Sequence, residues 1–265
     1  MALTGVAVSE ATSADGTQIA CWCFGRGDPI LFVHGMSESH VNWQPVAERL
    51  SSTFAVCTMD RRGRGASSDA MPYAFEREIE DVTAVAVTLG RVVVLAHSIA
   101  GPFALEAAMT SDAIRAVILY EAWASPPTEM PPEMLEEIER LISLGRYEEV
   151  FNYGNSPEEI EASRQLPDYA DRLAAVPTFP REIRGWQRYW QHHPVDNERW
   201  RALDKPVLLL IGEENRESVM PAAQDFAERL PHASIGLLKG QGHFAYRDAP
   251  DLVVAAVRPW LDSLI

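Results

Sequence analysis

Short runs of consecutive apolar residues recur along the chain, and few of them alternate with polar residues. A strand that is apolar at every position buries both faces, as strands do inside a parallel sheet. Such runs, bounded by glycine, proline or polar residues, predict strands. The predicted strands are Thr17–Phe24, Ile30–Val33, Phe54–Met59, Val92–Ala96, Ala116–Tyr120, Val207–Ile211 and Ser234–Leu238.

Segments with helical spacing lie between most of these strands. The clearest one runs from Ala74 to Leu89, and Gly90 follows it as a stop signal. The alternation of strand and helix predicts an α/β fold with a mainly parallel, doubly wound sheet. The other helical segments are Val46–Leu50, Pro102–Met109, Ala222–Leu230 and Asp251–Leu264.

This alternation is interrupted after Glu121 and resumes at Lys205. Residues 122–204 contain half of the eighteen prolines and favour helices, most clearly Pro132–Leu144 and Pro157–Leu166. We therefore predict a core formed by residues 1–121 and 205–265, with residues 122–204 inserted as a helical cap. The insertion follows the carboxyl end of a strand, where open α/β sheets bind ligands, so we expect it to act as a lid.

One serine stands between a buried strand and the helix that follows directly. Ser98 would occupy a sharp strand-to-helix turn, with its hydroxyl above the sheet edge. Ala96 and Ala100, two positions away on either side, are small enough for so tight a turn. This arrangement is typical of a nucleophile elbow. The alternative is that Ser98 only caps the helix, a common position for serine.

A serine nucleophile needs a base, and His243 is the best placed of the seven histidines. It lies in Gly240-Gln241-Gly242-His243-Phe244, between the last predicted strand and the last predicted helix. Neighbouring glycines at a sheet edge suit a side chain that reaches into a cleft. The alternative is an ordinary surface histidine.

An oxyanion hole requires two converging N–H donors. The turn after the strand Ile30–Val33 contains His34 and Gly35, and the next amide, that of Met36, can face the reaction centre. The Ile99 amide at the start of the helix supplies the second predicted donor.

The charge of the chain limits its classes of partner, and its cysteine content indicates the redox conditions around it. The formal charge is −15 and the pI is about 4.9, which argues against nucleic acid or an anionic membrane as a partner. We expect a small-molecule substrate, and the oligomeric state is not predicted. Cys21, Cys23 and Cys57 are predicted to be small buried hydrophobic residues in a reducing compartment.

Signals for targeting, membrane insertion and cofactor binding are not found in the sequence. It has no signal-peptide pattern and no apolar run long enough to span a bilayer, which favours a cytoplasmic location. It also has no P-loop, dinucleotide fingerprint or cysteine–histidine cluster, so we expect neither cofactor nor metal.

Four motifs occur together along the chain: His34-Gly35, Asp60-Arg61-Arg62-Gly63-Arg64-Gly65-Ala66-Ser67, Ala96-His97-Ser98-Ile99-Ala100-Gly101 and Gly240-Gln241-Gly242-His243. In this order and spacing, the chain resembles the α/β-hydrolase superfamily over essentially its whole length. The resemblance implies that fold, and it matches residues 122–204 to the variable cap of the family. The loop that begins at Asp60 is expected to be structural.

The third member of a catalytic triad departs from the common pattern of this family. Asn215 stands where most members have an aspartate. Some haloalkane dehalogenases place their acid after the preceding strand, which in this chain points to Glu121. A buried carboxylate needs a partner, which also favours Glu121. The alternatives are that Glu214 or Glu217 is the acid, or that Glu121 only lines the pocket or caps the entry to the lid.

Serine at the elbow indicates an acyl-enzyme, whereas relatives that form alkyl esters use aspartate. We therefore predict a serine hydrolase acting on a carboxylic ester of a small or medium-sized hydrophobic substrate. The alternatives are a lactonase, a thioesterase, a C–C bond hydrolase, or a receptor or pseudoenzyme on the same fold. The predicted pocket residues are His34, Trp123, Trp186 and Trp190.

Overall fold

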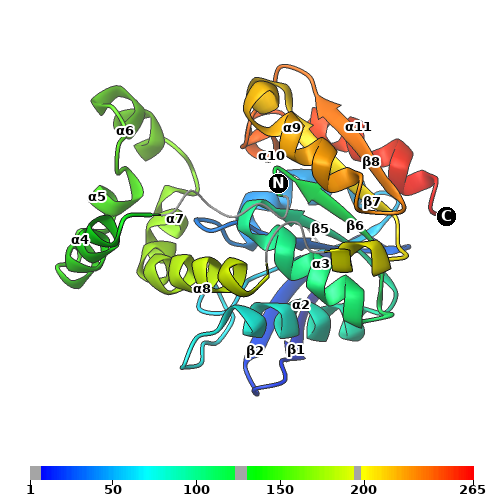
Figure 1. Cartoon of the computed structure of the whole chain (residues 1–265), viewed down its shortest axis with the longest axis horizontal. Helices are drawn as coiled ribbons and strands as arrows, with labels where there is room; N and C mark the ends of the chain where they lie inside the picture. The colour runs from blue at the N-terminus through cyan, green and yellow to red at the C-terminus, as the bar shows by residue number, and fades with distance from the viewer. Residues whose placement is uncertain (1–6, 123–129, 194–197) are drawn as a thin grey trace.

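A computed structural model describes residues 7–122, 130–193 and 198–265, and its centre is an eight-stranded sheet (Figure 1). The strands are β1 (Ala7–Thr12), β2 (Gln18–Phe24), β3 (Pro29–Val33), β4 (Ala55–Met59), β5 (Val92–His97), β6 (Ile114–Tyr120), β7 (Val207–Gly212) and β8 (Ala233–Leu238). Their order in space is β1-β2-β4-β3-β5-β6-β7-β8. Every pair from β4 to β8 is parallel, whereas β1 and β2 are antiparallel additions at one edge. The predicted fold class is confirmed.

Helices cover both faces of the sheet. On one face lie α2 (Phe75–Leu89), α3 (Gly101–Thr110) and α9 (Arg216–Ala227), and on the other lie α1 (His40–Leu50), α10 (Ala245–Asp248) and α11 (Pro250–Asp262). Strand β5 contributes to both cores, since Val92 and Val94 join the first and Val93 and Leu95 join the second. This two-sided burial explains why the strand is a continuous apolar run up to its last residue, His97.

Between β6 and β7 the described chain is helical, and Figure 1 shows most of these helices to one side of the sheet. We call them the intervening helices: α4 (Pro132–Ser143), α5 (Tyr147–Phe151), α6 (Pro157–Arg164), α7 (Tyr169–Ala175) and α8 (Phe179–His192), with the short helices η2 (Val176–Thr178) and η3 (Glu198–Ala202). A small core including Ile138, Leu141, Val150 and Val176 joins some of them. Helix α8 also packs against α2. The predicted helices are present, and the division into two domains stays a prediction.

Two features at the antiparallel edge differ from the sequence predictions. Strand β1 is absent from those predictions, because its sequence, half polar, lacks the continuous apolar run of the central strands. The prediction of unpaired cysteines is wrong for Cys23 and Cys57, which form a disulfide. The two residues lie directly opposite each other on β2 and β4, a relationship hidden by their separation of 34 residues. Cys21 is free and buried.

None of the helices in the described ranges is long and apolar enough to cross a membrane.

Candidate active site

The turn at Ser98 joins β5 to α3 through one short helix, η1 (Ser98–Ala100). Ser98 has a φ of 55°, in the left-handed region, where a residue with a side chain is strained. Its side chain is half-buried, while Ala96 and Ala100 are fully buried beneath it. The residue that caps α3 is Ala100, so Ser98 does not serve as its N-cap. The strand–turn–helix geometry expected of a nucleophile elbow is therefore present.

Glu121 begins the neighbouring turn, immediately after β6, and it has a φ of 48°. It shares left-handed geometry with Ser98 alone among the non-glycine residues described. Because β5 and β6 pair His97 with Tyr120, Ser98 and Glu121 leave the sheet side by side. Gly101 follows the first turn and packs against Ala122 of the second; a Cβ atom at Gly101 would lie 2.9 Å from the Ala122 Cβ.

The Glu121 carboxylate contacts His243. Its Oε2 atom lies 3.5 Å from Nδ1 of His243, a long contact of the kind found in enzymes without substrate. The Gly212 amide donates to Oε1 at 2.7 Å, and the Asn215 side-chain amide donates to Oε2 at 2.8 Å. Burial raises the pKa of Glu121, but His243, Gly212 and Asn215 together outweigh burial and lower it. The buried carboxylate is thus kept charged beside the imidazole.

The other carboxylates considered for this role lie elsewhere. Glu214 and Glu217 are not buried, and neither bonds to His243 within the described chain. A Cβ atom at Gly242 would lie 2.6 Å from Oε2 of Glu214, so that carboxylate packs against the loop before His243. The Asn215 side-chain amide donates a hydrogen bond to the carboxylate of Glu121.

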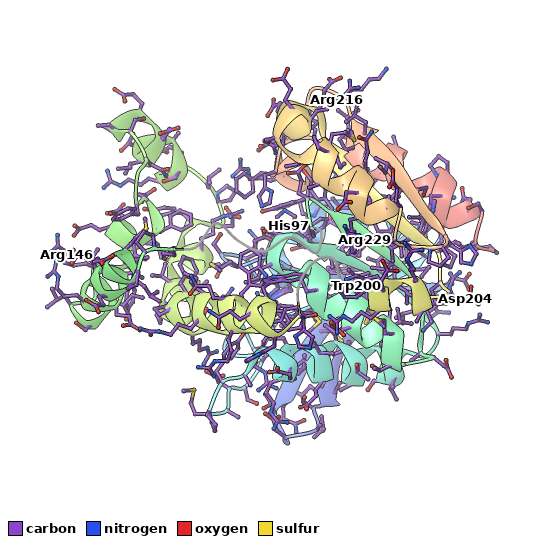
Figure 2. The ribbon with its side chains drawn as sticks, viewed as in Figure 1. His97, Arg146, Trp200, Asp204, Arg216 and Arg229 are labelled. Carbon is purple, nitrogen blue, oxygen red and sulfur yellow. A yellow bond between two sulfur atoms is a disulfide. The ribbon has the colours of Figure 1, made fainter. Side chains whose placement is uncertain are left out.

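A second histidine–glutamate pair, which the sequence pattern does not reveal, supports the His243 loop from within. His97, near the centre of the molecule in Figure 2, is completely buried. Its Nδ1 lies 2.8 Å from Oε1 of Glu38, and its Nε2 lies 3.0 Å from the carbonyl oxygen of His243. Burial raises the pKa of Glu38, but His97, Arg172 and the Gly35 amide outweigh it and hold the pKa well below the usual range. In the sequence, His97 is marked only by its place in the serine motif.

The turn after β3 lies beside Ser98, and its peptide groups are tightly held. A Cβ atom at Gly35 would lie 3.3 Å from the Ser98 Cβ and 3.0 Å from Nδ1 of His97, which explains the glycine. The Gly35 carbonyl accepts hydrogen bonds from Nδ1 of His34 at 2.9 Å and from Arg61 at 3.1 Å. Because C=O and N–H point in opposite directions in a trans peptide, these bonds fix the direction of the Met36 N–H.

His34, which is predicted to line the substrate pocket, lies under this turn, where it is 1% exposed. Its Nε2 accepts the Arg61 backbone N–H at 3.1 Å, so Nδ1 carries the proton that is donated to Gly35. Burial, together with the charges of Arg61 and Arg64, lowers the pKa of His34 to about 3. The ring is therefore neutral and structural in this position.

Two buried arginines connect the same turn to the intervening helices. Arg61 pairs with Glu78 of α2 at 2.6 Å and with Glu182 of α8 at 2.8 Å. Arg64 donates to the Met36 carbonyl and also pairs with Glu182. The loop that begins at Asp60, expected to be structural, thus links α8 to the turn that contains the predicted oxyanion amide.

The remaining predicted residues have different surroundings. Ile99 is buried in the core on the α3 side of the sheet, and Met36 packs partly against that core. Trp186 and Trp190 lie four residues apart on α8 and join the same core, with Trp190 6% exposed. Both indole N–H groups lack a hydrogen-bond partner among the described residues. Trp123 lies outside the described residues.

Known proteins match this chain over most of its length. The alpha/beta hydrolase family matches residues 30–256. N-formylmaleamate deformylase of Pseudomonas putida is 32% identical over 248 residues, covering 90% of each chain. Esterase YbfF of Escherichia coli is 23% identical over 264 residues, covering 90% of this chain and 94% of the esterase.

A solved structure is also similar to this chain. An alpha/beta hydrolase from Sphaerobacter thermophilus superimposes with a TM-score of 0.79 and 29% identity, covering 96% of this chain and 98% of the other. The family and these relatives indicate a hydrolase. The chain belongs to the alpha/beta hydrolase family.

Proposed function

We propose that the protein is a serine hydrolase that cleaves a carboxylic ester of a small or medium-sized hydrophobic substrate through an acyl-enzyme intermediate. The observation that carries the proposal is the charged Glu121 carboxylate 3.5 Å from His243, next to the strained turn at Ser98. Strained backbone of this kind is often retained at a site where it serves the reaction.

In the proposed reaction, the Ser98 oxygen attacks the ester carbonyl carbon while His243 takes the hydroxyl proton. His243 uses Nε2 for this step, since Nδ1 faces Glu121. The Met36 and Ile99 amides hold the oxyanion, and Glu121 stabilises the imidazolium. The protonated His243 then gives its proton to the departing alcohol, which leaves an acyl-serine.

Water completes the cycle through the same groups. His243 takes a proton from water as the water oxygen attacks the acyl carbon, and the Ser98 oxygen leaves with that proton. The products are a carboxylic acid and the free enzyme. Trp186 and Trp190 on α8 pack with the core that also contains Ile99, which supports a cap role for the intervening helices.

Cleavage of an N-acyl bond is the second candidate, favoured by the 32% identity to N-formylmaleamate deformylase. The same acyl-enzyme route serves an amide, with an amine in place of the alcohol. The hydrogen bond that Asn215 donates to Glu121 supports the hydrolase over the receptor alternative, which rests on Asn215 in place of a triad acid.

The test combines a fluorophosphonate probe with a chain-length series of p-nitrophenyl esters. We expect the wild-type protein to be labelled and to hydrolyse the short esters, and Ser98→Ala to lose labelling and at least about 10⁴-fold in turnover. Ser218→Ala, an exposed serine on α9, is the matched control and should keep both activities. Labelling that persists in Ser98→Ala would refute the nucleophile assignment.

A further inference from the structure

A cavity of about 360 Å³ adjoins the candidate active site, between the sheet-edge loops and the intervening helices. Met36, whose amide is the predicted oxyanion donor, lines it, and so does Phe244, which follows His243. The Phe244 and His243 rings lie 5.0 Å apart. A substrate acylating Ser98 could therefore extend into this cavity.

One wall of the cavity carries a buried cation. Arg172 of α7 is 2% exposed. Its Nε donates to the Asp168 carboxylate at 2.8 Å, and its Nη2 donates to the Tyr246 hydroxyl at 3.2 Å. Its Nη1 group makes no hydrogen bond with any residue of the described chain. Because Arg172 lines the cavity and this charged N–H group is unbonded among the described residues, it can donate a charge-assisted hydrogen bond to an incoming anion.

A second guanidinium lies on the same cavity. Arg247 of α10 engages the adjacent Asp248 through Nε at 2.6 Å and Nη2 at 2.9 Å. Within the described residues its Nη1 is unbonded, as in Arg172. The Phe244 ring links the two groups, with its centroid 5.6 Å from Cζ of Arg172 and 5.1 Å from Cζ of Arg247. Ser37 and Asn155 add neutral polar groups to the lining.

We propose that this cavity binds a carboxylate on the acyl part of the substrate, an inference that rests on the proposed function. The substrate class is then a half-ester or half-amide of a small dicarboxylic acid. Its second carboxylate would accept hydrogen bonds from Nη1 of Arg172 and Nη1 of Arg247, and Ser98 would attack the other carbonyl. A local pair of arginines is needed for such a ligand, because the chain as a whole carries a charge of −15.

The experiment compares monomethyl succinate with dimethyl succinate, which differ in one free carboxylate. Hydrolysis is followed by pH-stat titration at pH 7.5. We expect wild-type kcat/KM to favour the monoester by at least about tenfold, and Arg247→Gln to reduce this monoester-to-diester ratio by about 10- to 100-fold. A wild-type preference for the diester, or an unchanged ratio in Arg247→Gln, would overturn the proposal.

Two further variants separate charge recognition from folding. Arg172→Lys keeps the cation and should retain more of the preference than Arg172→Gln. Arg184→Gln removes an exposed arginine of α8 that pairs with Glu139, outside the lining of this cavity, and should leave the ratio unchanged. Equal loss of the ratio in Arg184→Gln would mean that overall charge, not the cavity, selects the substrate.

Calorimetry with succinate separates this proposal from the proposed function. We expect Ser98→Ala to bind succinate, and addition of Arg247→Gln to weaken binding by at least about tenfold. If the wild-type protein hydrolyses neither ester and escapes the probe, but this binding difference is found, the hydrolase proposal fails and the anion site stands. If Ser98 is labelled but succinate does not bind, the anion site fails alone.

Discussion

Two turns at the ends of neighbouring strands share one unusual backbone geometry but are stabilised in different ways. The Ser98 turn follows β5, and buried alanines with a glycine next along the chain make room for it. The Glu121 turn follows β6, and its carboxylate is held by Gly212, Asn215 and His243, which are 91, 94 and 122 residues away in sequence. The first turn depends on local small residues, and the second depends on distant donors.

The difference matters for the chemistry of each side chain. In the proposed reaction Ser98 is the nucleophile and must be open to substrate, and among the described residues its strained backbone is supported by packing below it and not by bonds to its hydroxyl. The proposed role of Glu121, an orienting acid, requires it to stay charged while buried, and a buried charge needs donors around it. The Glu121 turn therefore contains hydrogen-bond donors from distant parts of the chain, which stabilise a charge. The Ser98 turn contains small neighbouring residues, which leave its side chain accessible.

Among substitutions at these two turns, removal of the charge at Glu121 should have the largest effect on activity. We expect Glu121→Gln to lower kcat by about 10⁴-fold, because a neutral amide cannot stabilise the imidazolium of His243. Ester hydrolysis at saturating substrate, with probe labelling as a second readout, measures the loss. Glutamine keeps only one acceptor oxygen for the donors Gly212 and Asn215, so urea unfolding checks that the variant remains folded.

Glu214→Gln and Glu217→Gln are the matched controls for this prediction. Neither residue is buried, and their substitution should leave kcat within about twofold, as expected for surface changes of this kind. If either control loses activity while Glu121→Gln retains it, then the acid lies after β7 and Glu121 is not the residue that orients His243.

The sequence predicts the Ser98 turn better than the Glu121 turn for a physical reason. The apolar run of β5, the small residues and the following helix are adjacent in the chain, so one local pattern contains the whole turn. Nothing local marks Glu121, which becomes a candidate only because Asn215 occupies the position where the resemblance to the α/β-hydrolase superfamily implies an acid. The bonds from Gly212 and Asn215 to Glu121 exist only after β6 and β7 pair.

The same distinction accounts for the other differences. The central strands are predictable because their burial on both faces leaves a continuous apolar run, whereas β1 is half polar and depends on pairing with β2. The Cys23–Cys57 disulfide and the Glu38–His97 pair also join residues far apart in sequence. The motif that contains His34 lies near the site, which is why the sequence predicts that His34 lines the pocket. The hydrogen bonds of the His34 ring, which only the fold shows, hold that ring beneath the loop.

Gly101 is where the two turns touch, and enlarging it should have the second largest effect. A Cβ atom there would lie 2.9 Å from the Cβ and 3.1 Å from the carbonyl carbon of Ala122, so one turn must move. We expect Gly101→Ala to destabilise the fold by about 1 to 3 kcal/mol, as overpacking of a core does, and to lower kcat as well. Urea unfolding and ester hydrolysis measure the two effects.

A compensating change tests whether the contact itself is responsible. Gly101→Ala combined with Ala122→Gly removes the opposing Cβ, although the backbone atoms of residue 122 remain. The double variant should recover part of the lost stability. Gly240→Ala is unsuitable as a control because Gly240 has a φ of 64°, whereas Gly185→Ala would meet chiefly the ring of Tyr73 at 2.9 Å and should cost less. Equal losses at Gly185 and Gly101 would argue against a special coupling of the turns.

The smallest effect is expected from Asn215, one of the distant donors. Asn215→Ala removes a 2.8 Å hydrogen bond to a buried carboxylate. Because Asn215 is only half-buried and water can replace its donor, we expect a loss of at most about 1 kcal/mol in the free energy of unfolding at pH 7. Urea unfolding of the variant and the wild-type protein measures this difference.

The pH dependence of that loss shows whether it acts through the charge of Glu121, whose pKa is lowered in the folded protein. A depressed pKa stabilises the fold above the unfolded value, 4.5 for this glutamate, and that stability is lost as the pH falls through the folded value. Asn215→Ala brings the folded and unfolded pKa values of Glu121 closer together. The difference in unfolding free energy between the variant and the wild-type protein should therefore shrink below pH 4.5. Urea unfolding at a series of pH values down to about 3 measures it. A difference that stays constant as the pH falls would mean that Asn215 supports the turn by packing and not through the charge of Glu121.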